Sequence, residues 1–171
     1  LWAHRNGGVV YLFGNVGSAA QAAHFAAELV VRFEQKDNRP AIAAIDLSSQ
    51  NASMTACMND LGPTEWPARF VDAMHQHDLL ILLTTSCRSP NVVRAVERTM
   101  ERRPHGPRLA GLYGQWPGRF AEMPEVLGPA LHPRINIPSA EVSAVQEATL
   151  HWIHRICAAV ELALRAKETP P

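Results

Sequence analysis

Residues 9–18 read VVYLFGNVGS, and this stretch decides the fold. Its apolar half, residues 9–13, predicts a buried β-strand, and a helical pattern over residues 19–34 follows the turn. A turn with two glycines and a serine leaves backbone N–H groups unpaired at the positive end of a helix dipole. Such a turn either binds an anion, for which phosphate is the first expectation, or only reverses the chain.

Strands and helices alternate along the rest of the chain. Apolar runs predict four further strands, and amphipathic or capped stretches predict the helices between them. The predicted strands are 41–45, 79–83, 109–113 and 132–137. The predicted helices are 50–58, 65–76 with Thr64 as N-cap, and 90–103. A last helix follows Ser139 and runs to about Arg165. Residues 114–128 are expected to be irregular and the C-terminal tail to be frayed. The alternation predicts an α/β fold with three layers, in which a doubly wound, five-stranded parallel sheet has the order 2-1-3-4-5.

Composition limits the function classes. The chain has 171 residues, as many Lys and Arg as Asp and Glu, and a hydrophobic fraction of 47%, which is typical of one globular domain over residues 1–171. Because there is no basic excess, we expect neither direct nucleic-acid binding nor binding to an anionic membrane. No apolar run is long enough to span a membrane. Three cysteines without metal-type spacing indicate reduced thiols in a cytoplasmic protein.

The predicted strand order brings two turns together. The order reverses between the first and third strands, so the turns Gly14–Ser18 and Thr84–Ser89 would face each other at the carboxyl edge of the sheet. Neither turn contains a lysine, and no GxxxxGK[ST] or GxGxxG motif occurs, so a nucleotide cofactor is not expected. Hydroxyls and backbone amides suit a single terminal phosphate, as in a sugar phosphate. The alternative for the hydroxyls of Thr84, Thr85, Ser86 and Ser89 is helix capping.

Two helices carry residues suited to acid–base chemistry. His24 and Glu28 lie four residues apart on one face of a helix. The last helix offers Gln146, His151 and His154, and an offset of roughly 80° lets Gln146 and His154 face one crevice. The imidazole and carboxylate groups could act as base and acid, or hold a divalent metal such as zinc. The alternative is a structural or solvated role on a helix surface.

With these motifs, the sequence resembles the sugar isomerase (SIS) domain family and, within it, the phosphoheptose isomerases. The resemblance covers residues 8–164, and the family's usual N-terminal helical segment has no counterpart here. It rests on Gly14-Asn15-x-Gly17-Ser18, Ala23-His24-Phe25-x-x-Glu28-Leu29, Arg32-Phe33-Glu34, Asn59-Asp60, Thr85-Ser86-x-x-Ser89-x-Asn91-Val92-Val93, and Gln146-Glu147 followed by Ile153-His154.

The resemblance implies an SIS fold, a homotetramer with sites at subunit interfaces, and a specific reaction. Family members interconvert sedoheptulose 7-phosphate and D-glycero-D-manno-heptose 7-phosphate, the first step towards lipopolysaccharide heptoses. The resemblance places acid–base catalysis on Glu28 and His154, with either as the base. It assigns substrate and phosphate binding to Asn15, Gly17, Ser18, Arg32, Thr84, Thr85, Ser86, Ser89 and Gln146. Zinc, which some members hold, would be bound by His24, Glu28, Gln146 and His154.

The sequence departs from the family pattern mainly around this site, at Val16, Gln50, Cys87, Arg88 and Thr149. If the first turn needs a positive φ, the β-branched Val16 is strained there. Two other functions therefore stay open: a non-catalytic SIS-fold adaptor, resembling the DnaA initiator-associating protein, and a sugar-phosphate sensor. Retention of both Glu28 and His154 favours the enzyme.

Overall fold

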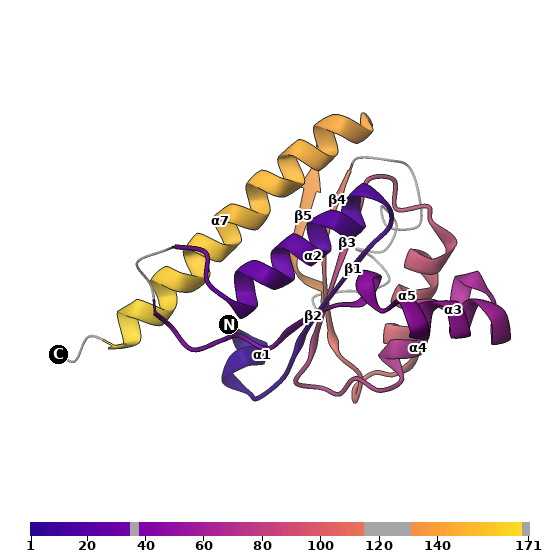
Figure 1. Cartoon of the computed structure of the whole chain (residues 1–171), viewed down its shortest axis with the longest axis horizontal. Helices are drawn as coiled ribbons and strands as arrows, with labels where there is room; N and C mark the ends of the chain where they lie inside the picture. Colours follow the sequence, from indigo (N-terminus) through magenta and orange to yellow (C-terminus); the bar gives the residue numbers. More distant parts are fainter. Residues whose placement is uncertain (35–37, 115–130, 169–171) are drawn as a thin grey trace.

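The computed structural model describes residues 1–34, 38–114 and 131–168, and one parallel sheet organises them (Figure 1). The strand order β2-β1-β3-β4-β5 is the predicted one, and β1 pairs with both β2 and β3. The reversal of strand order therefore lies between β1 and β3, as expected. The strands are β1 (Val10–Gly14), β2 (Ala44–Asp46), β3 (Leu79–Thr84), β4 (Arg108–Gly114) and β5 (Leu131–Ile137).

Helices cover both faces of the sheet, which confirms the three-layer fold (Figure 1). Side chains alternate along each strand, so Leu80 and Leu82 pack into one core and Ile81 and Leu83 into the other. One face carries α1 (Trp2–Arg5), α2 (Gly17–Val30) and α7 (Val142–Glu168); the other carries α3 (Asn51–Asp60), α4 (Ala68–Val71) and α5 (Pro90–Glu101), with the 3-10 turns η1 (Leu47–Ser49) and η2 (Pro63–Glu65). No helix in the described ranges is long and apolar enough to cross a membrane.

The predicted helix over residues 65–76 is wrong. In its place the chain forms η2, which includes Thr64, and the single turn α4. Trp66 is extended, with φ −90° and ψ 124°. Pro67 explains this break, because a proline disfavours the helical conformation of the residue before it.

Other element boundaries also differ from prediction, and the strand predicted over residues 41–45 is Ala44–Asp46. The helix predicted over residues 19–34 ends at Val30, and the last helix begins at Val142 rather than directly after Ser139. The Ser139 hydroxyl still accepts a hydrogen bond from the Glu141 N–H at 3.1 Å, just outside the helix. The irregular segment and the tail that the sequence predicts fall mostly in residues 115–130 and 169–171, outside the described residues.

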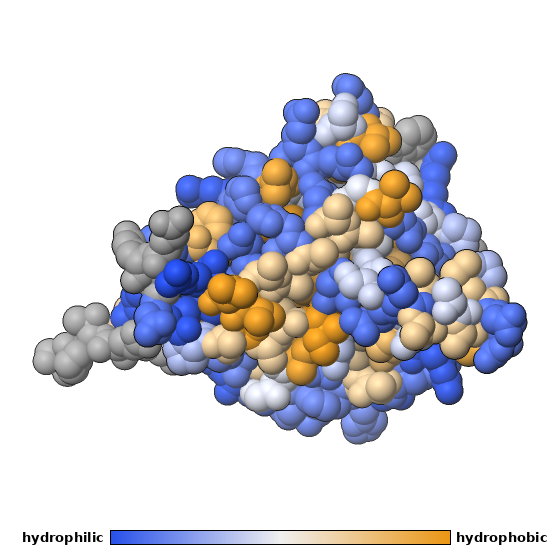
Figure 2. All heavy atoms as spheres, viewed as in Figure 1, coloured by the Kyte–Doolittle hydropathy of each residue, from blue (hydrophilic) through white to orange (hydrophobic). Residues whose placement is uncertain are grey.

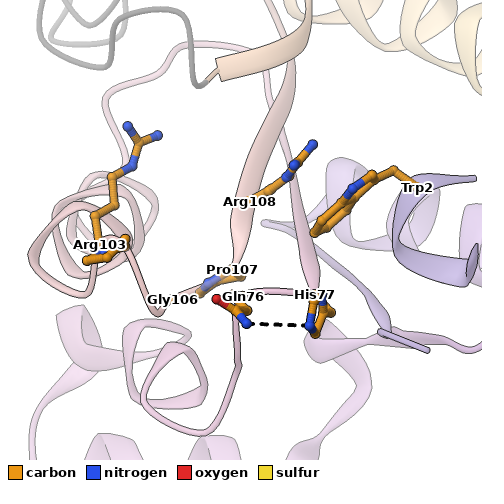
Figure 3. A pocket seen from close by; sticks show the side chains of 8 residues that line it. Trp2, Gln76, His77, Arg103, Gly106, Pro107 and Arg108 are labelled. Atoms are coloured by element: carbon orange, nitrogen blue, oxygen red, sulfur yellow. Dashed lines mark hydrogen bonds between the residues drawn. The ribbon is translucent and has the colours of Figure 1, made fainter. Parts of the chain in front are cut away.

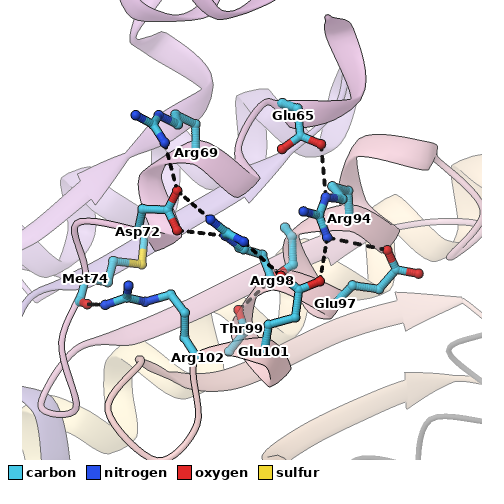
Figure 4. A network of polar contacts seen from close by, with 11 residues as sticks. Glu65, Arg69, Asp72, Met74, Arg94, Glu97, Arg98, Thr99, Glu101 and Arg102 are labelled. Carbon is cyan, nitrogen blue, oxygen red and sulfur yellow. Dashed lines mark hydrogen bonds and ion pairs between the residues drawn. The ribbon is translucent and has the colours of Figure 1, made fainter. Parts of the chain in front are cut away.

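Ion pairs fasten the helices of the second face to one another (Figure 4). Arg98 of α5 donates to both carboxylate oxygens of Asp72, at 2.7 and 3.1 Å. Arg94 donates to Glu65 at 3.0 Å and to Glu101 at 2.9 Å. These bonds hold the short elements η2 and α4 against α5, far from the face that carries α2 and α7.

Candidate functional site

The turn after β1 is closely packed at both glycines. A Cβ on Gly14 would lie 2.5 Å from the backbone carbon of Ser18, and a Cβ on Gly17 would lie 2.3 Å from Nε2 of Gln146. The Ser18 N–H donates to the Asn15 carbonyl at 3.0 Å, and Ser18 is buried. The structure thus brings Asn15, Gly17 and Ser18 together with Gln146 of α7.

Val16 has a positive φ, so it is strained as the sequence predicts for a turn of this kind. Its φ is 51° and its ψ −114°, a conformation that suits glycine. The side chain is 93% exposed, so no burial offsets the strain. Contacts of neighbouring residues, and not the Val16 side chain, therefore hold the turn in this shape.

A reciprocal amide pair joins the first turn to the start of α5, the helix that follows the second turn. Each of Asn15 and Asn91 donates its Nδ2 to the other's Oδ1 at 3.0 Å. Next to the pair is a pocket of about 350 Å³, which Ser48 and Trp66 also line. Trp66 is buried, and its indole Nε1 has no acceptor within the described residues. Asn91 belongs to a quoted motif but was not predicted as a site residue, and no sequence signal pointed to Trp66.

Two hydroxyls of the second turn form hydrogen bonds within the turn. Thr84 Oγ1 accepts from the Cys87 N–H at 3.2 Å, and Ser86 Oγ accepts from the Arg88 N–H at 3.4 Å. Neither bond caps α5, and the side chain of Ser89, which sits at the N-cap of α5, makes no capping bond either. Helix capping therefore does not account for these three hydroxyls. Because a hydroxyl that accepts a hydrogen bond keeps its O–H donor, Thr84 and Ser86 can still donate.

Cys87 is the second strained residue of the site. It is almost fully buried and has φ 55°. Burial raises the pKa of its thiol to about 12. The thiol is therefore protonated at neutral pH and does not act as a nucleophile.

Helices α2 and α7 bring the predicted acid–base residues together. Nε2 of His24 and Nε2 of His154 are 3.0 Å apart, within hydrogen-bond distance. The Glu28 carboxylate lies 3.8 Å from the same nitrogen of His24. His24 thus stands between Glu28 and His154, and the Phe33 ring packs 5.5 Å from the His154 ring.

This cluster opens onto a shallow pocket of about 340 Å³ between the two helices, lined by Ala20, Gln21, His24, Leu150 and His154. His151 does not join the cluster; its ring lies beside Trp152. Arg32 is exposed beyond the end of α2, and no interaction within the described residues ties it to the cluster. Gln146 contacts the Gly14–Ser18 turn instead, about 12 Å along α7 from His154 at 1.5 Å per residue.

The predicted zinc ligands are brought together only in part. Two ligands of a tetrahedral zinc ion are roughly 3.3 Å apart, which is close to the 3.0 Å between the two imidazole nitrogens. His24, Glu28 and His154 supply the donor types of a catalytic zinc site, while Gln146 lies elsewhere. Within the described part of the chain, no group of three His, Cys, Asp or Glu side chains already has the spacing of a metal site.

A further pocket, of about 470 Å³, involves none of the predicted site residues (Figure 3). It lies where β3 and β4 begin, at the amino edge of the sheet. The Arg108 guanidinium stacks on the Trp2 ring there at 3.5 Å. The candidate site therefore consists of the two turns at the carboxyl edge and the cluster between α2 and α7.

The site thus combines a doubly wound parallel sheet, two turns at its switch point and an imidazole–carboxylate cluster between α2 and α7. The chain belongs to the SIS domain family, whose profile matches residues 2–103. Relatives that match most of its length are named phosphoheptose isomerases.

The relatives match most of the chain. Phosphoheptose isomerase of Azoarcus sp. (strain BH72) is 35% identical over 165 residues, which is 95% of this chain and 79% of the relative. The solved structure of phosphoheptose isomerase from Neisseria gonorrhoeae has a TM-score of 0.79 at 30% identity, covering 93% of this chain and 79% of that one. The structure of a phosphoheptose isomerase from Francisella tularensis has a TM-score of 0.80 at 29% identity, covering 92% and 78%.

Proposed function

We propose that this protein is a phosphoheptose isomerase that interconverts sedoheptulose 7-phosphate and D-glycero-D-manno-heptose 7-phosphate. The observation that carries the proposal is the contact of His24, Glu28 and His154 across two helices. An adaptor would need no such cluster, whereas an aldose–ketose isomerase needs an acid and a base side by side.

The two parts of the site suit the two ends of the substrate. A phosphate at carbon seven would bind the Gly14–Ser18 and Thr84–Ser89 turns through backbone N–H groups and hydroxyls. The carbonyl end would then extend towards the acid–base cluster. Six residues of α2 separate Ser18 from His24, about 9 Å at 1.5 Å per residue. This separation suits a seven-carbon chain better than a triose.

Isomerisation moves a proton between adjacent carbons through an enediol. We assign Glu28 as the base that takes the carbon-bound proton and His154 as the acid that protonates the neighbouring oxygen; the two roles could be exchanged. In the bond between His24 and His154, one nitrogen donates and the other accepts. The bond therefore couples the tautomers of His24 and His154 to each other.

Zinc fits the donor types of this cluster. We propose that a zinc ion, where one is bound, is held by His24, Glu28 and His154, a His₂Glu set like that of catalytic zinc sites. Such an ion would polarise the sugar carbonyl. Gln146 would instead contact the substrate near the phosphate turn, because it packs against Gly17.

The proposed assembly is a homo-oligomer, with a tetramer as the expectation from the family. The pocket between α2 and α7 is shallow, and an enediol needs protection from water. Figure 2 shows apolar residues over α2. Val30 at the end of α2, Val31 next to it and Ile45 of the neighbouring strand β2 are exposed. A second copy on this face would cover both the apolar residues and the pocket. Three buried free cysteines suit a reducing, cytoplasmic location.

Variants of the cluster test this function. We expect purified protein to isomerise sedoheptulose 7-phosphate, and Glu28→Gln and His154→Ala each to lower kcat by at least about a hundredfold, in line with acid–base catalysis. His151→Ala is the matched control, because His151 lies on the same helix outside the cluster. A folded, oligomeric wild-type protein without turnover would refute the enzyme, and sugar-phosphate binding without turnover would identify a sensor.

A further inference from the structure

A buried carboxylate on α7 binds the chain that leaves α2. Glu161 is only 1% exposed. Its two carboxylate oxygens accept the backbone N–H groups of Phe33 at 2.6 Å and Glu34 at 2.9 Å. The Nε of Arg39 lies 3.3 Å from one of the same oxygens. Glu161 thus fixes the path of the backbone directly after α2.

Arg39 binds the end of α2 itself. Its side chain is 6% exposed, and its guanidinium donates to the carbonyls of Glu28 at 2.8 Å and Leu29 at 2.9 Å. The last carbonyls of a helix have no partner inside the helix, so the guanidinium takes the place of the missing turn. A single arginine therefore joins the last turn of α2 to α7.

Both ends of the proposed acid–base pair are connected to this ion pair. Arg39 bonds to the backbone of Glu28, whose side chain would be the base. Glu161 bonds to the backbone of Phe33, whose ring packs on the imidazole of His154. Seven residues, close to two helical turns, separate His154 from Glu161, so they lie on the same face of α7.

We propose that Arg39 and Glu161 are positioning residues for the reaction. The pair sets the distance between the Glu28 carboxylate and the His154 imidazole by fixing the end of α2, the Phe33 ring and α7 against one another. The expected effect on turnover rests on the proposed isomerase function. The position of His154 relative to Phe33 does not, because it can be measured without substrate. The competing explanation is an ion pair that only stabilises the fold.

Kinetics of Glu161→Gln separate the two explanations. A small displacement of catalytic groups lowers turnover by up to roughly a hundredfold, so we expect kcat to fall ten- to a hundredfold while KM changes less than about twofold. Glu101→Gln is the control, because Glu101 also forms ion pairs with arginine but lies on α5 in the other layer. Equal kcat values for the wild type and Glu161→Gln in the folded state would overturn the proposal.

A double variant separates positioning from stability. Removing one partner of a buried ion pair leaves an uncompensated charge, whereas removing both does not. The backbone groups that Arg39 and Glu161 bind lose these partners in the double variant. In Arg39→Met/Glu161→Met we therefore expect the melting temperature to lie above that of Glu161→Met but below the wild-type value, while kcat stays low. If kcat recovers together with stability, the ion pair is purely structural and the proposal fails.

A readout without substrate keeps the two proposals apart. The ring current of Phe33 acts on the imidazole protons of His154, so NMR reports their relative position. We expect the His154 resonances to shift in Glu161→Gln and not in Glu101→Gln. If the wild type has no turnover, the isomerase function fails, while this shift still decides the positioning role; unchanged resonances would refute it.

Discussion

Replacement of Val16 by glycine is the sharpest test of the turn after β1. Val16 has φ 51° and ψ −114° and exposes 93% of its surface. A β-branched residue is strained in this conformation, and glycine is not. Since the side chain buries almost nothing, the substitution removes strain and little else.

The expected gain follows from two opposing terms. Residues in sparsely populated backbone conformations are strained by about 1–3 kcal/mol. Glycine adds freedom to the unfolded chain, which lowers stability by roughly 0.5–1 kcal/mol. The net result for Val16→Gly is a gain of up to about 2.5 kcal/mol, or up to about 10 °C in melting temperature for a protein of this size.

Urea and thermal unfolding at several protein concentrations measure this gain. Leu61→Gly is the control, because Leu61 is also exposed and adjoins a helix, but its φ is −119° and it lies in the other layer. We expect Leu61→Gly to lower stability by roughly 0.5–1 kcal/mol. Val16→Asn should lie between valine and glycine, since asparagine tolerates a positive φ. A Val16→Gly variant as destabilised as Leu61→Gly would refute the strain argument.

Three further predictions concern thiols, metal and pH. Burial raises the pKa of Cys87 to about 12, so a thiol reagent at pH 8 should label this residue only after unfolding, as peptide mapping would show. Zn²⁺ should raise the melting temperature of the wild type and of Gln146→Ala, but not of His24→Ala, because Gln146 lies at the turn. The hydrogen bond from Arg98 lowers the pKa of Asp72, so its stabilisation is present above the unfolded pKa and is lost as pH falls through the folded value. Asp72→Asn should therefore lower the urea midpoint at pH 7, and the difference should vanish in acid.

The sheet could be predicted because its strands carry their own signal. In a parallel sheet covered on both faces, a strand is apolar throughout, as residues 79–83 are. Local chemistry also places the turns after β1 and β3, and the strand order then makes them neighbours. Pro67 also signals the break within residues 65–76, because a proline disfavours the helical conformation of the residue before it.

Other features depend on partners far away in the chain. Helix α2 ends at Val30, where Arg39 binds its last carbonyls and Glu161 binds Arg39. Arg39 and Glu161 are 122 residues apart in the sequence. The contact between His24 and His154 joins residues 130 apart, and periodicity within either helix says nothing about it. Only the family resemblance placed these two histidines in one site. Trp66 gave no signal because its missing hydrogen-bond partner exists only in the folded chain.

Backbone strain links the two turns of the site. Val16 and Cys87 are the non-glycine residues with positive φ in the described part of the chain, and each lies in one of the two facing turns. Strained conformations persist only when their surroundings enforce them. Here the Asn15–Asn91 amide pair connects the first turn to the start of α5, which directly follows the second turn. Val16 and Cys87 therefore keep conformations that suit glycine because contacts of neighbouring residues hold the two turns together.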